Sequence, residues 1–298
     1  MNEHKFYTVD VFTNSKFGGN PLAVIPNAEN LDEKLFQSIA NELNLSETTF
    51  VLPPVDSNND YRVRIFTPTV EVPTAGHPTI GTSYVLLNEM NYKPKFDNRL
   101  LLEEEVGLIT VDFQKVNNIY QDITMNQPLP VFGEMSKKHD LVANLLSIQE
   151  TDIDKDKPIQ SVSCGNNFLF VPVKSIESLQ KIKLKLDLFE KYRNEFESIN
   201  LYVFTMETFD KESDTHARMF APLFGVIEDP ATGSASGPFG CYLVKHGLSN
   251  GENIICEQGY EINRPSKINV NIGYKNNEFE YVRVSGNIVT VCEGVIKI

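Results

Sequence analysis

Two short stretches hold the side chains whose types and spacing could do chemistry. EDPATGSASG covers residues 228–237, EVPTAGHPTIG covers residues 71–81, and an apolar run follows each of them. Each combines carboxylates and hydroxyls, or a histidine, with a proline and a glycine, immediately before residues that are typical of a buried helix. The first N–H groups of a helix lack partners and carry partial positive charge. Two such helix starts facing one cleft would bind a carboxylate or an enolate-like oxyanion.

Both stretches belong to an internal repeat. RIFTP precedes the first and RMFAP precedes the second, so each copy reads R-x-F-x-P, a spacer, then E-x-P-x-x-G-[HS]. The copies lie about 155 residues apart and differ by one three-residue insertion in the spacer. A period this long predicts two related domains rather than a solenoid of short repeats.

The polar residues of these motifs also have purely structural explanations. Thr232, Ser234 and Ser236 could cap a helix, Asp229 could lie near a helix dipole, and His77 could be a histidine with satisfied hydrogen bonds at a helix start,. Any one of them alone is better explained by structure. The duplication of the whole arrangement favours a functional site.

Strands rich in β-branched and aromatic residues must position these motifs. The predicted strands cover 6–12, 22–26, 48–54, 61–67, 166–173, 199–207, 268–274, 279–286 and 287–298. The predicted helices cover 30–44, 136–148, 175–183 and 188–196, besides the apolar runs after the two motifs,. FGGNP at 17–21 is interpreted as a turn, because a strand-like run follows it.

The likeliest linker by composition lies near 117–130, where a turn-rich stretch separates the two patterned halves,. We therefore expect an N-terminal domain over 1–118 and a C-terminal domain over 119–298, with the last strands free to return to the first domain.

Composition excludes several classes of partner. The net charge of −13 argues against nucleic acid and anionic membranes, which need a basic surface,. No apolar stretch is long enough to span a membrane, and the N-terminus lacks the features of a signal peptide, so we expect a cytoplasmic protein,.

The four cysteines form no CxxC pair and are interpreted as reduced thiols,. The sequence has no metal-ligand spacing of histidines and no phosphate-binding glycine motif, so no metal, nucleotide or other cofactor is expected,.

Four blocks give the chain a family resemblance. NLSETTFV at 44–51, RIFTPTVEVPTAGHPTIG at 64–81, EDPATGSASG at 228–237 and CEQGYEINRPSKI at 256–268 resemble the signature blocks of the PhzF-like family of isomerases. The resemblance implies the diaminopimelate-epimerase-like fold, of α+β class. That fold has two similar domains, each a curled mixed sheet around a central helix, with the active site between them. It also suggests a homodimer.

The resemblance separates this chain from the epimerases of that fold. Those enzymes use two cysteine bases, one before the glycine at each helix start, and the matching positions here are Ala75 and Thr232. Two-base cysteine racemisation is therefore not expected. Cys241 lies well inside the second apolar run and is predicted to be a core residue.

The resemblance also implies roles for particular residues. A glutamate in the SET block is the acid–base residue of the family's isomerase, and here it is Glu47, although a structural role as a cap at a helix end or a strand start is the alternative. The implied catalytic residues are Glu47, His77 and Asp229, and the implied substrate-binding residues are Gly76, Gly233 and Ser234.

These roles lead to a hypothesis about the reaction. A buried carboxylic acid can move one proton between two carbons when it faces both, and Leu45, Phe50 and Val51 could supply apolar surroundings for Glu47,. The expected substrate is a small carboxylic acid similar to trans-2,3-dihydro-3-hydroxyanthranilate. Two alternatives stay open: a racemase or epimerase with Asp229 or His77 as second base, and a metabolite-binding protein without turnover.

Overall fold

The computed structural model describes residues 3–298, except for the side chain of residue 224. The chain forms two compact units, the first from residues 1–126 and 284–298 and the second from residues 127–283. The sequence-based boundary at 118/119 falls in the tight turn of a hairpin, β7 (Gly107–Val116) with β8 (Ile119–Gln127). Because the two strands are paired, the structure keeps them together in the first unit up to Asn126.

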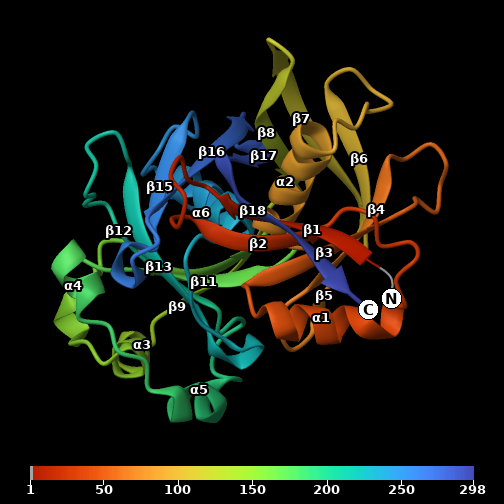
Figure 1. The fold of residues 1–298 in the computed structure, drawn as a ribbon. Coiled ribbons are helices and arrows are strands. Elements are labelled where there is room, and N and C mark those ends of the chain that lie inside the picture. The colour runs from red at the N-terminus through yellow and green to blue at the C-terminus, as the bar shows by residue number, and fades with distance from the viewer. Residues whose placement is uncertain (1–2) are drawn as a thin grey trace. The chain divides into compact units, whose positions relative to one another are not determined.

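The first unit is a curled mixed sheet. Its other strands are β1 (Glu3–Val11), β2 (Asn20–Ile25), β3 (Glu47–Leu52), β4 (Tyr61–Phe66), β5 (Glu71–Val72), β6 (Arg99–Glu104) and β18 (Ile288–Lys297). The β2–β3 and β4–β6 pairs are parallel, and the remaining pairs are antiparallel. β18 pairs with β1, and Glu3 lies opposite Lys297, so the first and last described strands of the chain lie side by side (Figure 1).

The second unit repeats this connectivity. Its strands are β9 (Val131–Ser136), β10 (Ile159–Ser163), β11 (Asn167–Pro172), β12 (Leu201–Thr205), β13 (Thr215–Ala221), β14 (Val226–Asp229), β15 (Ile254–Gln258), β16 (Ser266–Lys275) and β17 (Glu278–Ser285). Strands β10 to β16 pair in the same order and direction as β1 to β7, with β11–β12 and β13–β15 parallel. β9 pairs with β10 as β18 pairs with β1. The long-period repeat in the sequence is therefore a repeat of the fold.

One helix lies at the centre of each unit. α2 (Gly76–Tyr84) continues into the π-helical turn η2 (Val85–Glu89), and α6 (Gly233–Lys245) is its counterpart. Nearly all of their residues are buried, which explains why both runs are apolar and rich in small residues. The predicted α+β class, with a curled sheet around a central helix in each unit, is confirmed (Figure 1).

The remaining helices cover other faces of the sheets. In the first unit η1 (Glu33–Leu35) leads into α1 (Phe36–Leu43), whose Phe36 stacks on Phe50 at 4.0 Å between ring centroids. In the second unit α3 (His139–Leu146), α4 (Ile176–Gln180) and α5 (Leu186–Tyr192) pack on a separate apolar cluster with β10, β11 and β12. Three short 3-10 turns complete the unit: η3 (Glu150–Asp152), η4 (Pro222–Phe224) and η5 (Tyr260–Ile262).

The sequence-based predictions of strands and helices are confirmed in outline. Every predicted strand and helix has a counterpart that overlaps it. The boundary between the two units, at 126/127, falls within the stretch predicted as a linker, 117–130, but most of that stretch is β8 and its asparagines make the hairpin turn. Asn117 and Asn118 take positive φ values of 52° and 66° there, a conformation that asparagine tolerates well,.

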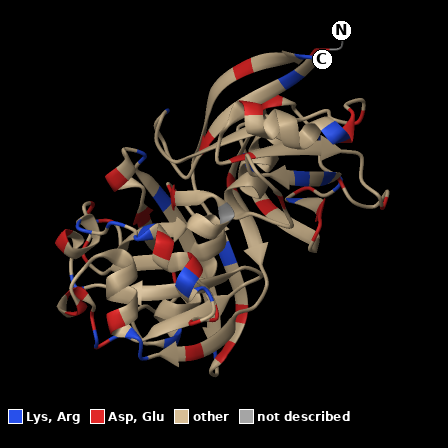
Figure 2. Ribbon diagram, turned by 90° about the horizontal axis from the view of Figure 1, so that it is seen from below, with Lys and Arg blue, Asp and Glu red and all other residues tan. Residues whose placement is uncertain are grey.

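Charged side chains are spread over strands and loops of both units (Figure 2). Aspartate and glutamate outnumber lysine and arginine by 40 to 27, which is the origin of the net charge of −13. Among residues 3–298, no helix is both long enough and apolar enough to cross a membrane.

Candidate functional site

In the first unit, Glu47 and His77 lie together. Glu47 is the first residue of β3, and His77 is the second residue of α2. His77 Nε2 lies 2.9 Å from Glu47 Oε2, and the two side chains are only 5% and 14% exposed. The angles are not those of a hydrogen bond, and neither atom has a hydrogen-bond partner among the described residues. Buried polar atoms nearly always have such a partner, so this pair is suited to bind a polar ligand.

Two contacts fix the strand and the helix that hold this pair. Thr49 Oγ1 of β3 lies 2.8 Å from Thr82 Oγ1 of α2, and both side chains are fully buried. Gly81 allows the helix to approach the sheet closely, because a β-carbon there would lie 2.6 Å from Leu22 Cδ2 and 2.9 Å from Val11 Cγ2. Thr49 lies two residues after Glu47, and Gly81 and Thr82 lie four and five residues after His77, so these contacts hold the two functional groups near each other.

The start of α2 has no side-chain cap. Its N-cap is Ala75, which has no side chain that could accept from the first N–H groups. The predicted binding residue Gly76 is the first helical residue and is buried. The helix dipole adds partial positive charge at this end, so the N–H groups around Gly76 and His77 suit a carboxylate.

The second unit holds the other predicted residues. Asp229 ends β14 and is 9% exposed, Gly233 begins α6, and Ser234 follows it with a partly exposed side chain. Thr232 is the N-cap of α6, yet it does not cap the helix, because its hydroxyl donates to Asp229 Oδ2 at 2.5 Å. This helix start therefore also has no side-chain cap from its N-cap residue, and a carboxylate and a hydroxyl lie beside it.

Gln258, at the end of β15, holds the segment before α6 in place. Its Oε1 accepts from the Thr232 N–H at 3.1 Å, and its Nε2 donates to Thr232 Oγ1 at 2.9 Å and to the Asp229 carbonyl at 2.7 Å. All of these groups are buried. One amide thus fixes both the carboxylate-bearing residue and the N-cap of the helix.

The arginine and glutamate of the sequence repeat form a clamp in each unit. Arg64 donates from Nε and Nη2 to the two oxygens of Glu71, both at 2.7 Å. Arg218 does the same to Glu228 at 2.8 and 2.7 Å. Each guanidinium also lies over the ring of the phenylalanine two residues later in its strand, at 5.2 and 5.0 Å. These repeated residues therefore brace the strand that leads to the site and contribute no group to it.

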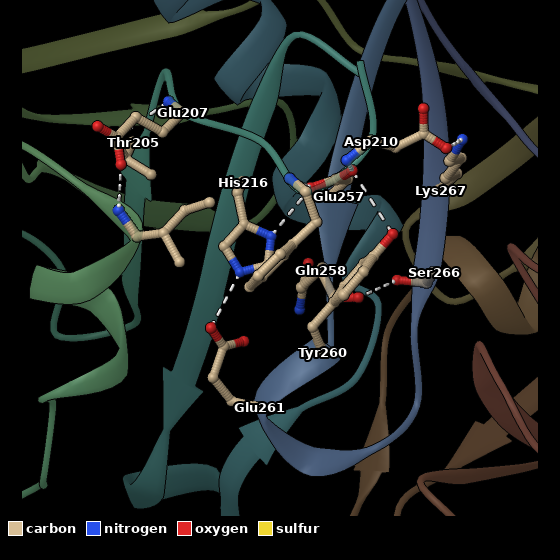
Figure 3. Close-up of polar contacts among 12 residues, drawn as sticks. Thr205, Glu207, Asp210, His216, Glu257, Gln258, Tyr260, Glu261, Ser266 and Lys267 are labelled. Atoms are coloured by element: carbon tan, nitrogen blue, oxygen red, sulfur yellow. Dashed lines mark hydrogen bonds and ion pairs between the residues drawn. The ribbon is translucent and has the colours of Figure 1, made fainter. Parts of the chain in front are cut away.

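A second polar cluster in the same unit surrounds His216 (Figure 3). His216 is fully buried, with Nδ1 3.3 Å from Glu257 Oε2 and Nε2 3.0 Å from Glu261 Oε1. Burial lowers the pKa of His216, but the two carboxylates outweigh burial and the net shift is upward. Burial raises the pKa of Glu257 and Glu261, but contacts with His216 and, for Glu257, the N–H groups of Phe209 and Asp210 outweigh burial, so the net shift of both is downward.

The His216 cluster has a structural counterpart in the first unit. His216 pairs with Glu257 across β13 and β15, and Arg62 pairs with Glu103 at the equivalent place across β4 and β6. Both glutamates accept backbone N–H groups of a nearby loop: Glu257 from Phe209 and Asp210, and Glu103 from Val55 and Asp56. A cation and a loop-binding carboxylate therefore recur in both units, and we interpret this cluster as structural.

Several supporting residues were not predicted. Gln258 lies in a block that carries the family resemblance, but no role was given to it, and Thr49 and Thr82 have no sequence signal beyond their polarity.

Ala75 and Thr232 are found at the two N-cap positions, so no thiol lies at either helix start. Cys241 is fully buried in α6, as predicted. Among the described residues no group of His, Cys, Asp and Glu side chains has the arrangement of a metal site.

Comparison with known proteins agrees with this architecture. The model of the phenazine biosynthesis-like family, PhzC-PhzF, matches residues 9–294. An uncharacterized isomerase of Clostridium acetobutylicum is 37% identical over 98% of this chain and 97% of its own length. A trans-2,3-dihydro-3-hydroxyanthranilate isomerase of Pseudomonas chlororaphis is 33% identical over 98% of this chain and 99% of its own. The crystal structure of a Bacillus anthracis phenazine biosynthesis protein of the PhzF family has a TM-score of 0.90 at 29% identity, covering 100% of both chains.

The matches define this protein as an isomerase of the PhzF type. The chain belongs to the phenazine biosynthesis-like family, as the sequence blocks predicted.

Proposed function

We propose that this isomerase moves a proton between two carbons of a small conjugated carboxylic acid, with Glu47 as both base and acid. The observation that carries the proposal is the pair of buried atoms Glu47 Oε2 and His77 Nε2, 2.9 Å apart and without hydrogen-bond partners among the described residues. The 33% identical relative that is named for trans-2,3-dihydro-3-hydroxyanthranilate supports the substrate class.

In the proposed step, the Glu47 carboxylate takes a proton from a carbon next to the conjugated system. The electron pair of the broken C–H bond is delocalised over the double bonds of the substrate. The neutral Glu47 then returns the proton to another carbon of the same system, and the carboxylate is restored. The step is an isomerisation with no net oxidation and requires no co-reactant. General acid–base catalysis of this kind contributes about 10²–10⁴-fold.

The other predicted residues would bind the substrate. His77 and Asp229 would hold its amine or hydroxyl substituents, and the N–H groups around Gly76 and Gly233, with Ser234, would hold its carboxylate. Oriented donors are worth about 3–4 kcal/mol each where charge develops.

A turnover assay tests the proposal. The protein is incubated with trans-2,3-dihydro-3-hydroxyanthranilate and the absorbance change is followed, with Glu47→Gln beside Glu42→Gln as the matched control on the exposed end of α1. We expect conversion by the wild type and the control, and a loss of at least about 10²-fold in Glu47→Gln. Near-normal turnover by a folded Glu47→Gln protein would refute the proton shuttle. No turnover by the wild type would refute this substrate.

A further inference from the structure

Glu104 is a buried carboxyl that the proposed reaction does not use. It ends β6 on the same face of the strand as Leu100 and Leu102, and it is 7% exposed. Its Oε2 accepts from Thr74 Oγ1 at 2.5 Å, and its Oε1 lies 2.5 Å from Thr79 Oγ1. Thr74 and Thr79 flank Gly76 and His77, so Glu104 joins β6 to the start of α2.

The hydrogens available to these oxygens determine the charge of Glu104. A threonine hydroxyl carries one hydrogen, and Thr79 Oγ1 lies close to two acceptors: Glu104 Oε1 at 2.5 Å and the Ala75 carbonyl at 2.7 Å,. In the second unit the equivalent residue of α6, Ser236, gives its hydrogen to the Thr232 carbonyl at 2.9 Å. If Thr79 likewise donates to Ala75, the hydrogen between Thr79 and Glu104 must come from the carboxyl group.

The second unit shows which chemistry belongs at this place in the fold. Glu104 follows Glu103 and Gln258 follows Glu257, and these two glutamates occupy equivalent positions in the parallel pairs β4–β6 and β13–β15. Gln258 is neutral at every pH and donates from Nε2 to a threonine hydroxyl beside the N-terminus of its central helix,. A protonated glutamate would supply the same pair of groups, one acceptor and one donor.

We propose that Glu104 is a positioning residue that acts as a neutral carboxylic acid and holds the start of α2, as Gln258 holds the start of α6. Ionisation would remove the hydrogen that joins Glu104 to Thr79. Thr79 would then have to release the Ala75 carbonyl to donate to the carboxylate, and the helix start that bears Gly76 and His77 would shift. Rising pH would therefore loosen one side of the site.

The surroundings of Glu104 support its neutral state. Burial raises its pKa to about 7, and donation by the hydroxyls of Thr74 and Thr79 opposes the rise. A Thr79 hydroxyl that accepts from Glu104, as proposed, would not oppose it. Charged groups of neighbouring elements lie with Glu104 around a pocket of about 640 Å³: Arg62 and Arg64 of β4, Glu71 of β5, Glu103 of β6, Glu105 after β6, and Glu33 of η1. Arg64 is engaged by Glu71 and Glu33, and no cation lies within ion-pair distance of Glu104 among the described residues.

The direction of the pH effect follows from these values. The folded protein holds the Glu104 proton more tightly than the unfolded chain, whose glutamates titrate near 4.5. The stabilising contribution is therefore complete below pH 4.5 and is lost as pH rises through about 7,. Between pH 5 and pH 9 this one group should raise the unfolding equilibrium constant by on the order of 10²-fold.

The experiment compares urea unfolding of the wild type and Glu104→Gln from pH 5 to pH 9. We expect the unfolding equilibrium constant of the wild type to rise by about 10² over this range and that of Glu104→Gln to rise much less. Gln258→Glu, the reverse exchange in the second unit, should lose a similar amount of stability at high pH. Infrared difference spectra of the wild type minus Glu104→Gln should contain the C=O band of a protonated carboxylic acid at pH 5. Equal pH dependence of the wild type and Glu104→Gln, or no such band, would overturn the proposal.

The effect on catalysis rests on the proposed function and is measured separately. If the isomerase activity is present, kcat/KM of the wild type should fall above pH 7 in a limb that Glu104→Gln lacks. Glu104→Ala should lower kcat/KM throughout the pH range, since it has neither the acceptor nor the donor. A shared limb in wild type and Glu104→Gln would refute the positioning role. The unfolding and infrared results need no substrate, so they stand even if the proposed reaction fails.

Discussion

Replacing Arg218 with methionine should destabilise the second unit by about 3–5 kcal/mol. The guanidinium donates to both oxygens of Glu228 and, from Nη1, to the Leu179 carbonyl at 2.8 Å. The Arg218 and Glu228 side chains are only 10% and 11% exposed. Methionine keeps most of the packing but leaves the Glu228 carboxylate buried without a cation, and that uncompensated charge is the source of the large effect.

Replacing the arginine of the matching clamp in the first unit, Arg64, should cost less stability than replacing Arg218. Arg64 and Glu71 have the same two-bond geometry, but they are 18% and 32% exposed, so water can solvate the carboxylate that Arg64→Met leaves behind. We expect a loss of about 1.5–3 kcal/mol. Lys181 and Glu177, an i,i+4 pair with side chains 52% and 78% exposed, form the surface control, and Lys181→Met should cost far less than either arginine variant,.

Urea denaturation followed by circular dichroism measures all three variants under one set of conditions. The expected order of destabilisation is Arg218→Met, then Arg64→Met, then Lys181→Met. The double variant Arg218→Met/Glu228→Leu should recover part of the loss, because it removes the orphaned charge as well. If Arg218→Met costs no more than Lys181→Met, the clamp does not brace the strand and the explanation of the repeated arginine and glutamate is wrong.

Two further predictions concern the helix contact and the second polar cluster. Gly81→Ala should destabilise the first unit by about 1–3 kcal/mol, measured by thermal unfolding, because its β-carbon would lie 2.6 Å from Leu22 Cδ2,; unchanged stability would mean that the helix does not pack as described. His216→Gln should cost more stability at pH 6 than at pH 9. The pKa of His216 is raised in the folded state, so its contribution is complete below the unfolded value of 6.5 and is lost as pH rises through the folded value,. A loss that grows towards pH 9 would refute the charged assignment.

The sequence predicts the fold well where its periodicities are strong. The repeated motifs located both central helices, because the glycine that begins each helix and the apolar run after it need little context to interpret. The long hairpin of β7 and β8 was missed, since its outer ends are exposed and its turn asparagines resemble a linker. A composition change alone cannot distinguish a turn within a domain from a boundary between domains.

The residues around the site show a similar limit. The repeat indicated that Arg64 and Glu71 matter, but a pattern does not give their partner, and the structure shows that they bind each other. Glu104 lies in a run of three glutamates that is typical of a solvated surface. Its alternation with Leu100 and Leu102 was the available signal for burial, and Leu101 obscures that signal,.

The central claim is that Glu47 moves the substrate proton. The most direct measurement is mass spectrometry of the product formed from trans-2,3-dihydro-3-hydroxyanthranilate in deuterated buffer, with the wild type, Glu47→Gln and the Glu42→Gln control. The account predicts product from the wild type and the control, with solvent deuterium on the receiving carbon only in those turnovers in which Glu47 exchanges its proton with solvent before returning it, and neither product nor label with Glu47→Gln. Product formed by Glu47→Gln at the wild-type rate would contradict it.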